Sequence, residues 1–334
     1  MNPCMSRTIG PGTKIAAAVA AAAYLLLSGT SALAQAWPNR AVKVIVPAPA
    51  GGPGDVIGRA IAEKLSAVFG QQFIVDNRAG ANYAIGTEAV AKSAPDGYTL
   101  LMTASPHTIN PALYPNQTLD PIKDFAPITL VAVTPLVLVV HPSVPVKNVA
   151  ELLAFVRAQP GKVNYGSAGT GSTLHLAGEM FNKLGGVSMV HVPYKGVTQA
   201  VTDLLGGHVS LMFPGGPIAF PHVKTGKLRA LATTGSMRTA AAPDLPTVAE
   251  AGMPGFEISA WYGMLAPAGT PPAIVNRLHE EIVKALKSPE LKERWTSLGA
   301  DVVYQDTPEQ FNSFLKNDLT KWAKVIKEGN IRPD

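Results

Sequence analysis

The sequence predicts an α/β fold of two lobes, each with a largely parallel sheet covered by helices, with a cleft and hinge between them. Two series of short apolar runs alternate with helical patterns, the first from Val42 and the second from Lys147, an order typical of such sheets. Between them lies a long apolar run, Ile128 to His141, with Pro135 in its middle. Because proline is excluded from a central ladder position, this run predicts a strand that crosses between two sheets near Thr134 and Pro135.

Apolar residues at a helical period or in short extended runs define the elements in order. The predicted strands are 42–46, 73–75, 98–102, 163–166, 189–192, 209–213, 228–232 and 262–266. The predicted helices are 55–69, 85–93, 147–159, 173–184, 198–205, 272–288, 289–298 and 308–327. A stretch rich in proline and glycine, 241–255, predicts the return connection between lobes. We therefore expect residues 37–134 and 240–334 to form the first lobe and residues 135–239 the second, with ligands bound where strands end at the cleft.

The N-terminal segment predicts export. Residues 1–14 carry Arg7 and Lys14 and no acid, residues 15–27 are apolar, and small residues precede Ala34 and Ala36. This pattern is typical of a secretory signal peptide of residues 1–36, cleaved after one of these alanines. Its apolar part is shorter than the roughly 20 residues that span a bilayer. We therefore expect a periplasmic protein.

Composition excludes several classes of function. The single cysteine, Cys4, lies in the predicted signal peptide, so the remaining chain has no disulfide, thiolate metal site or thiol nucleophile. After residue 36 the chain has 26 basic and 23 acidic residues, a net charge of +3. Since no basic cluster is interleaved with aromatic residues, nucleic acid is not an expected partner. A mild positive charge favours an anionic small ligand.

Two glycine-rich turns, one in each lobe, join a predicted strand to a predicted helix. The first loop spans Pro47 to Asp55, and the second loop spans Gly166 to Thr173. Glycine lets backbone amides turn inward, and a helix N-terminus presents unpaired N–H groups, so such turns bind anions. The alternative is a capped turn without a ligand, since Asp55, Ser172 and Thr173 are all residue types that cap helices. One such turn in each lobe favours binding.

Neither loop has the spacing of a catalytic or nucleotide-binding motif. The Gly-Lys-Ser/Thr of a P-loop, G-x-G-x-x-G and G-x-S-x-G are all absent from them. The seven histidines form no H-E-x-x-H pattern and no close metal pair, and no nucleophile–base or carboxylate pair is visible. His175, behind the second loop, is interpreted as a packing residue or a contact to the loop or ligand. We expect no enzyme activity, no metal and no cofactor.

Further segments occur in a recognisable order along the chain. They are Trp37-Pro38, Ile45-Val46-Pro47 with Ala50-Gly51-Gly52, Asp55 and Arg59, Asp76-Asn77-Arg78, Ala94 to Leu100, Tyr165 to Ser167, Ser172, His175 to Glu179, Val192 to Gly196, Asp203 to Gly207, Gly226 to Ala232 and Leu265 to Pro271. Together they resemble the tripartite tricarboxylate transporter receptor family, the Bug-type extracytoplasmic solute receptors. The resemblance covers essentially the whole chain after the signal peptide.

The resemblance implies a type II periplasmic-binding-protein fold that closes on its ligand by hinge motion. It also implies that amides and hydroxyls of the two loops hold a ligand carboxylate, with waters bridging the rest. The candidate ligand-binding residues are Ala48, Ala50, Gly51, Gly52, Gly54, Asp55, Tyr83, Ser167, Gly169, Thr170, Ser172, Thr173, His175 and Phe213. Membrane permease subunits are the implied partners, and we expect a monomer.

Departures from the family pattern bear on the ligand. The aromatic residue usual after the first-loop proline is Ala48 here, and the usual threonine before Asp55 is Gly54. Tyr83 occurs in a glycine-rich stretch, and residues 214–217 (Pro-Gly-Gly-Pro) replace polar residues after Phe213. We expect a roomier, less polar pocket and a bulkier carboxylate, aromatic or ring-derived. The alternatives are a periplasmic sensor that presents the carboxylate to a signalling partner, and a hydrolase or lyase that uses His175 or Asp55.

Overall fold

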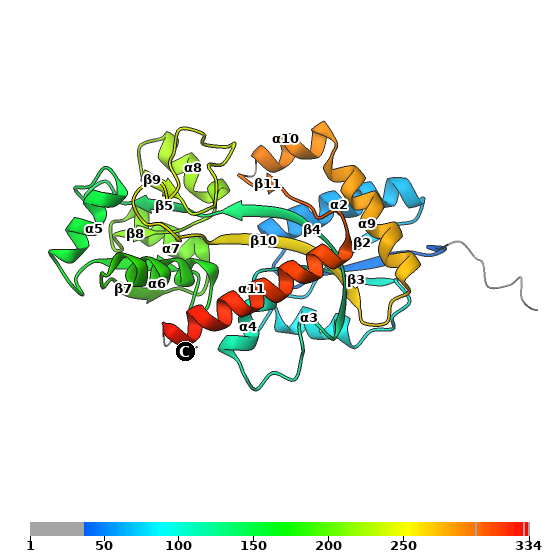
Figure 1. Ribbon diagram of the computed structural model, residues 1–334. Coiled ribbons are helices and arrows are strands. Elements are labelled where there is room, and N and C mark those ends of the chain that lie inside the picture. The colour runs from blue at the N-terminus through cyan, green and yellow to red at the C-terminus, as the bar shows by residue number, and fades with distance from the viewer. Residues whose placement is uncertain (1–36, 298, 330, 333–334) are drawn as a thin grey trace, which may run out of the picture. The chain divides into compact units, whose positions relative to one another are not determined.

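The computed structural model describes residues 37–332 apart from residues 298 and 330, so the predicted signal peptide lies outside the described residues. The strands form two β-sheets with helices packed on them (Figure 1), which confirms the α/β fold class. The strands are β1 (Val42–Val46), β2 (Phe73–Asn77), β3 (Thr99–Ala104), β4 (Phe125–Pro135), β5 (Val137–Val140), β6 (Asn164–Ser167), β7 (Val190–Pro193), β8 (Leu211–Met212), β9 (Arg229–Thr233), β10 (Ser259–Pro267) and β11 (Asp301–Val302). The helices are α2 (Pro53–Phe69), α3 (Ala84–Ala91), α4 (Pro106–Leu113), α5 (Val149–Arg157), α6 (Thr173–Gly185), α7 (Val197–Leu205), α8 (Gly216–Lys224), α9 (Pro272–Leu286), α10 (Pro289–Ser297) and α11 (Pro308–Glu328).

Both sheets are mixed rather than largely parallel. The described strands of the first sheet follow the order β11-β4-β10-β3-β1-β2, and those of the second follow β7-β6-β8-β5-β9. β1 runs parallel to β2 and β3, and β6 runs parallel to β7 and β8. The pairs that contain β4, β5 or β10 are antiparallel. The prediction of largely parallel sheets was wrong in this respect, because the strands that carry the chain between the sheets run against their neighbours.

The first crossing between the sheets lies where the sequence predicted it. β4 runs through the first sheet to Pro135, which pairs with Ser259, and β5 begins at Val137 in the second sheet (Figure 1). Only Leu136 separates the two strands. Proline at the last position of β4 therefore ends one ladder at the point where the chain passes to the other. Hinge motion at this point stays a prediction.

A buried threonine joins this crossing to the return of the chain. The hydroxyl of Thr234 accepts a hydrogen bond from the Leu136 amide at 2.8 Å and donates to the Ile258 carbonyl at 2.6 Å. Thr234 itself is completely buried. The chain before Ile258 also pairs with the second sheet, since the Thr233 amide donates to the Pro246 carbonyl at 2.8 Å. We therefore propose that the second lobe extends to Ile258 rather than ending at residue 239.

The helix pair α4 and α11 packs against the core of the second sheet. These helices contact each other, and α11 also contacts β4 of the first sheet. Ile109 and Leu113 of α4 and Trp322 of α11 are buried in the same apolar cluster as Tyr165 of β6. The described residues from Arg40 onward form one compact unit. The helix α4 thus borders elements of both sheets.

Candidate functional site

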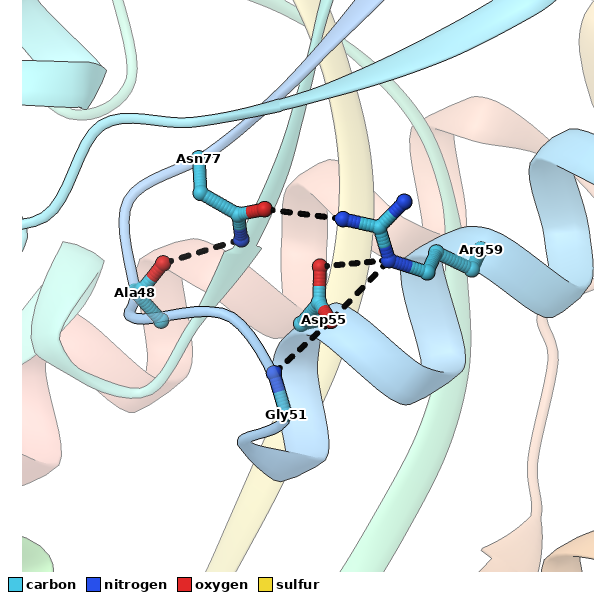
Figure 2. Close-up of polar contacts among 5 residues, drawn as sticks. All are labelled: Ala48, Gly51, Asp55, Arg59 and Asn77. Atoms are coloured by element: carbon cyan, nitrogen blue, oxygen red, sulfur yellow. Dashed lines mark hydrogen bonds and ion pairs between the residues drawn. The ribbon is translucent and has the colours of Figure 1, made fainter.

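The first loop is closed by a carboxylate that reaches back from the helix that follows it. Gly52 is the N-cap of α2, with Pro53 at the first helical position, where proline fits because its missing N–H would have no acceptor. Asp55, two residues on and almost completely buried, accepts a hydrogen bond from the Gly51 amide at 2.9 Å (Figure 2). Gly51 has φ +80°, a conformation that favours glycine. Asp55 therefore closes the loop onto the helix and is not the N-cap that the sequence suggested.

Two further side chains hold Asp55 and the loop backbone. The Arg59 guanidinium donates from Nε to the Asp55 carboxylate at 3.0 Å and from Nη2 to Asn77 Oδ1 at 3.0 Å (Figure 2). The Asn77 side-chain amide, through Nδ2, in turn donates to the Ala48 carbonyl at 3.0 Å. Burial alone would raise the pKa of Asp55, but hydrogen bonds from Arg59, Gly51 and Asn77 and the Arg59 charge outweigh it. The pKa of Asp55 is lowered, so the carboxylate is ionised at neutral pH.

The second loop has the same hydrogen-bond pattern, with a histidine ring nitrogen in place of the carboxylate. Ser172 is the N-cap of α6, and its hydroxyl accepts from the His175 amide at 3.3 Å and donates to the Gly169 carbonyl at 2.7 Å. His175 Nδ1 accepts from the Gly171 amide at 3.0 Å, and Gly171, like Gly51, has φ +80°. In both loops the third residue of the helix binds the amide of the residue before the N-cap. His175 thus has a local role in shaping the loop.

This geometry decides which amides remain for a ligand. The amides of Gly51 and Gly171 are engaged by Asp55 and His175. The N-cap amides of Gly52 and Ser172 donate to the Pro49 and Gly169 carbonyls. The N–H groups that follow belong to the first helical turn, where they have no intrahelical acceptor. These are the amides of Gly54 and Asp55 in the first loop and of Thr173 and Leu174 in the second. Helix N-termini carry a partial positive charge, so each pair of amides is suited to one carboxylate.

Two tyrosine side chains lie against the first helical turn. A Cβ placed on Gly54 would lie 3.6 Å from the Tyr262 ring and 3.9 Å from the Tyr83 hydroxyl. Among the described residues, neither phenol hydroxyl has a hydrogen-bond partner. Burial raises the pKa of Tyr83 to about 12, and burial with the nearby Tyr83 raises that of Tyr262. Both phenols are therefore neutral hydrogen-bond donors at physiological pH.

Two tyrosines lie beside Gly54, and the roomier, less polar pocket stays a prediction. The space that a threonine side chain would fill there is bordered by two aromatic rings, and each ring brings a hydroxyl group. A hydroxyl lost from residue 54 is thus replaced by that of Tyr83. An aromatic ring and a phenol hydroxyl therefore lie beside the first turn of α2.

A stack of aromatic rings supports the second loop from behind. The His175 and His191 rings are stacked with centroids 3.9 Å apart, and Tyr165 stacks on His191 at 5.1 Å. Ser167 Oγ forms a hydrogen bond of 2.6 Å with His191 Nε2. This serine–histidine pair was not visible in the sequence, because 24 residues separate the two residues. Ser167 is completely buried, so its hydroxyl holds the loop and is not an accessible nucleophile.

The remaining predicted site residues are dispersed. Ala50 is exposed, Gly52 is half-buried and Ala48 is buried with its carbonyl bound by Asn77. Gly169 donates its amide to Ser167 Oγ at 3.1 Å, and Thr170 is half-buried. Phe213 is completely buried, with its ring centroid 6.0 Å from that of Phe181 and 6.4 Å from that of Phe256. Phe213 therefore packs in the core of the second sheet and has no place in the site proposed below.

Four residues of the site were not among the candidates from the sequence: Arg59, Asn77, Tyr262 and His191. Arg59 was detectable, since it lies four residues after Asp55 on one helical face. The other three reach the loops from neighbouring strands. Asn77 lies in the segment Asp76-Asn77-Arg78 of the family pattern, whereas no local pattern marks Tyr262 or His191. In the ranges 37–297, 299–329 and 331–332, no cluster of three potential metal ligands occurs. No helix of the described residues is long and apolar enough to cross a membrane.

The family model of the tripartite tricarboxylate transporter family receptor matches residues 57–331. Protein BugT of Bordetella pertussis is 39% identical over 297 residues, which cover 88% of this chain and 91% of BugT. The structure of a periplasmic transporter is 41% identical, with a TM-score of 0.80 over 90% of this chain and 100% of the other. The structure of R. palustris Rpa4515 with adipate is 36% identical, with a TM-score of 0.81 over 89% of this chain and 100% of the other.

These similarities and the two-sheet fold define a solute-binding protein of the type II periplasmic-binding-protein class. The chain belongs to the tripartite tricarboxylate transporter receptor family, and it is similar to Bug-type receptors. This family consists of binding proteins, so the chain is a receptor and not an enzyme.

Proposed function

We propose that the chain captures a small organic carboxylate between its two loops in the periplasm and delivers it to permease subunits of a tripartite tricarboxylate-type transporter. The observation that carries this proposal is the shared design of the two loops. Each ends in a helix N-terminus whose first free amides are left for an anion, while the preceding glycine amide is occupied by a side chain of the same helix. The adipate bound by the R. palustris relative supports a carboxylate as the ligand.

The ligand has a bulky or ring-bearing body. The Tyr262 ring and the Tyr83 hydroxyl lie beside Gly54, 3.6 and 3.9 Å from a Cβ placed there. A carboxylate oxygen would accept from the Gly54 and Asp55 amides, and the phenols would donate to the same carboxylate or to a neighbouring oxygen. Aromatic rings pair in offset or edge-on geometries that favour a flat ligand body.

A carboxylate panel tests the ligand class directly. The chain from Trp37 onward is mixed with malate, adipate and benzoate, and with adipamide as an uncharged control, and unfolding is followed by temperature. Ligand at about 100 times its dissociation constant adds about 2.7 kcal/mol of stability. Stabilisation by at least one carboxylate and none by adipamide is expected. The absence of any carboxylate effect would refute the proposed function, and binding of malate alone would refute the ring-bearing ligand.

A pair of variants at Thr173 isolates the amide of the second loop. Ser172 is in extended backbone, with φ −66° and ψ 154°, so proline fits at the following residue, the first position of α6. Thr173→Pro removes both the amide N–H and the hydroxyl, whereas Thr173→Ala removes the hydroxyl alone. A charge-assisted hydrogen bond contributes about 1.5–3 kcal/mol, so the proline variant should bind about tenfold more weakly than the alanine variant or worse. Equal affinities in a calorimetric titration would show that this amide does not hold the ligand.

A further inference from the structure

The turn that carries Tyr83 has a backbone conformation that its own sequence does not favour. Ala81, Asn82 and Tyr83 have φ values of +45°, +46° and +77°, a run of three non-glycine residues in the left-handed region. Only asparagine among them adopts this region with any ease. Two backbone hydrogen bonds close the turn, from the Ala84 amide to the Ala81 carbonyl at 3.0 Å and from the Thr87 amide to the Tyr83 carbonyl at 3.2 Å. A conformation of this kind persists where its surroundings hold it in place.

A side chain from another helix holds this turn. Asn110 of α4 accepts a hydrogen bond from the Asn82 side-chain amide at 2.8 Å and donates one to the Asn82 carbonyl at 2.6 Å. The two bonds engage both the side chain and the backbone of the residue at the centre of the turn. Asn110 is buried, and Asn82 is half-buried. The next residue along the chain is Tyr83, whose hydroxyl lies against Gly54.

The helix that carries Asn110 is itself fixed in place. Thr108 of α4 donates its hydroxyl to the Asp318 carboxylate of α11 at 2.5 Å. Three residues after Asn110, Leu113 is buried in the core of the second sheet and lies so close to Gly171 that a Cβ there would overlap it. Asn110 therefore lies on a helix, α4, that also borders the second loop.

We propose that Asn110 is a positioning residue for ligand recognition: it holds the left-handed turn of residues 81–83 and thereby aims the Tyr83 hydroxyl at the ligand beside Gly54. The inference rests on the proposed function, because Tyr83 is taken to contact the ligand. Asn110 does not itself touch the ligand. It acts through Tyr83, and its effect on binding depends on the phenol.

The first arm of the test needs no ligand. Hydrogen exchange of the Ala84 and Thr87 amides is compared in the wild-type chain, Asn110→Ala and Asn110→Asp. The aspartate variant keeps an acceptor for the Asn82 side chain but cannot donate to the Asn82 carbonyl, and it serves if the alanine variant fails to fold. Faster exchange at both amides by roughly tenfold or more is expected, with the Leu176 amide of α6 unchanged. Unaltered protection of the turn would overturn the proposal whatever the ligand is.

The second arm measures affinity for adipate, or for the panel member that binds best, by calorimetry. Loss of a hydrogen bond to a carboxylate weakens binding by about tenfold or more. Tyr83→Phe should show such a loss, and Asn110→Ala should show a loss no larger than that of Tyr83→Phe. In the Tyr83→Phe background, Asn110→Ala should cause no further loss, whereas a loss that persists there would overturn the role through Tyr83.

A matched control separates positioning from stability. Asn182 is a half-buried asparagine near the C-terminal end of α6, where it binds the Met189 backbone at 2.9 and 3.3 Å. Asn182→Ala should lower stability and leave affinity unchanged. An affinity loss in this control equal to that of Asn110→Ala would overturn the proposal. If the wild-type chain binds no member of the panel, the proposed function fails, and the exchange arm still decides whether Asn110 holds the turn.

Discussion

Asp55 is the residue whose removal most directly tests how the first loop is built. Asp55→Ala leaves the Gly51 amide and the Arg59 guanidinium without their carboxylate acceptor. A hydrogen bond to a charged group contributes about 1.5–3 kcal/mol. The Arg59 side chain is 52% exposed, so its ion pair adds at most about 1 kcal/mol. The expected loss in the free energy of unfolding is therefore about 2–3 kcal/mol for alanine.

The variant Asp55→Asn keeps the shape of the Asp55 side chain and removes its charge. The amide oxygen still accepts one hydrogen bond, so the expected loss is only about 1 kcal/mol. Because the pKa of Asp55 is lowered in the folded protein, the stability contributed by its charge is present above the unfolded pKa near 4 and is lost as pH falls through the folded pKa. The wild-type and asparagine curves should therefore differ at pH 7 and converge toward pH 3.

Urea unfolding at pH 7 and at lower pH values measures both effects. Asp76→Asn is the matched control, since Asp76 pairs with Arg78 at 3.0 Å on the surface, where ion pairs contribute about 0–1 kcal/mol. If Asp55→Ala is no less stable than this control, Asp55 does not close the loop. A gap between wild type and Asp55→Asn that widens toward pH 3 would contradict the sign of the pKa shift.

Three further predictions concern the supports of the site. Gly171→Ala should destabilise the chain by about 1 kcal/mol or more in urea unfolding, because alanine would have to adopt φ +80° and its Cβ would overlap Leu113. If adding Leu113→Ala recovers none of the lost stability, the overlap with Leu113 is not the cause of the loss. Thr234→Val should cost about 1–3 kcal/mol by leaving buried groups of both crossings unpaired, and a smaller change in urea unfolding would show that Thr234 does not join them. Burial lowers the pKa of His107 to about 4. Because the unfolded chain binds a proton at His107 more readily, this group should lower the free energy of unfolding of the wild type by about 3 kcal/mol between pH 6.5 and 4. An equal dependence of stability on pH in His107→Gln would show that His107 is not the cause.

The sequence was most informative where a local pattern decides the structure. The predicted strand 42–46 coincides with β1, and the crossing at Pro135 was predicted because proline cannot occupy a central ladder position. The glycine-rich loops were found because glycine before a helix indicates amides turned toward an anion. In these cases one element alone contains the signal.

The sequence was least informative where proline interrupts a helix or where contacts are distant. The helices α4 and α8 were not predicted, because Pro111 and Pro221 lie inside them and proline disfavours a helix interior. β11 has only two residues, too few for a period. Tyr262 and Asn110 reach the turn of Tyr83 from other elements, so only the tertiary fold brings them together. The same holds for the two tyrosines beside Gly54.

A crystal structure of the chain with the carboxylate that stabilises it most would show directly whether the two loops hold the ligand. We expect one carboxylate group within about 3 Å of the Gly54 and Asp55 amides or of the Thr173 and Leu174 amides, with the Tyr83 hydroxyl donating to the ligand. A carboxylate bound elsewhere, with these four amides occupied by water or by other groups of the protein, would exclude the two-loop site.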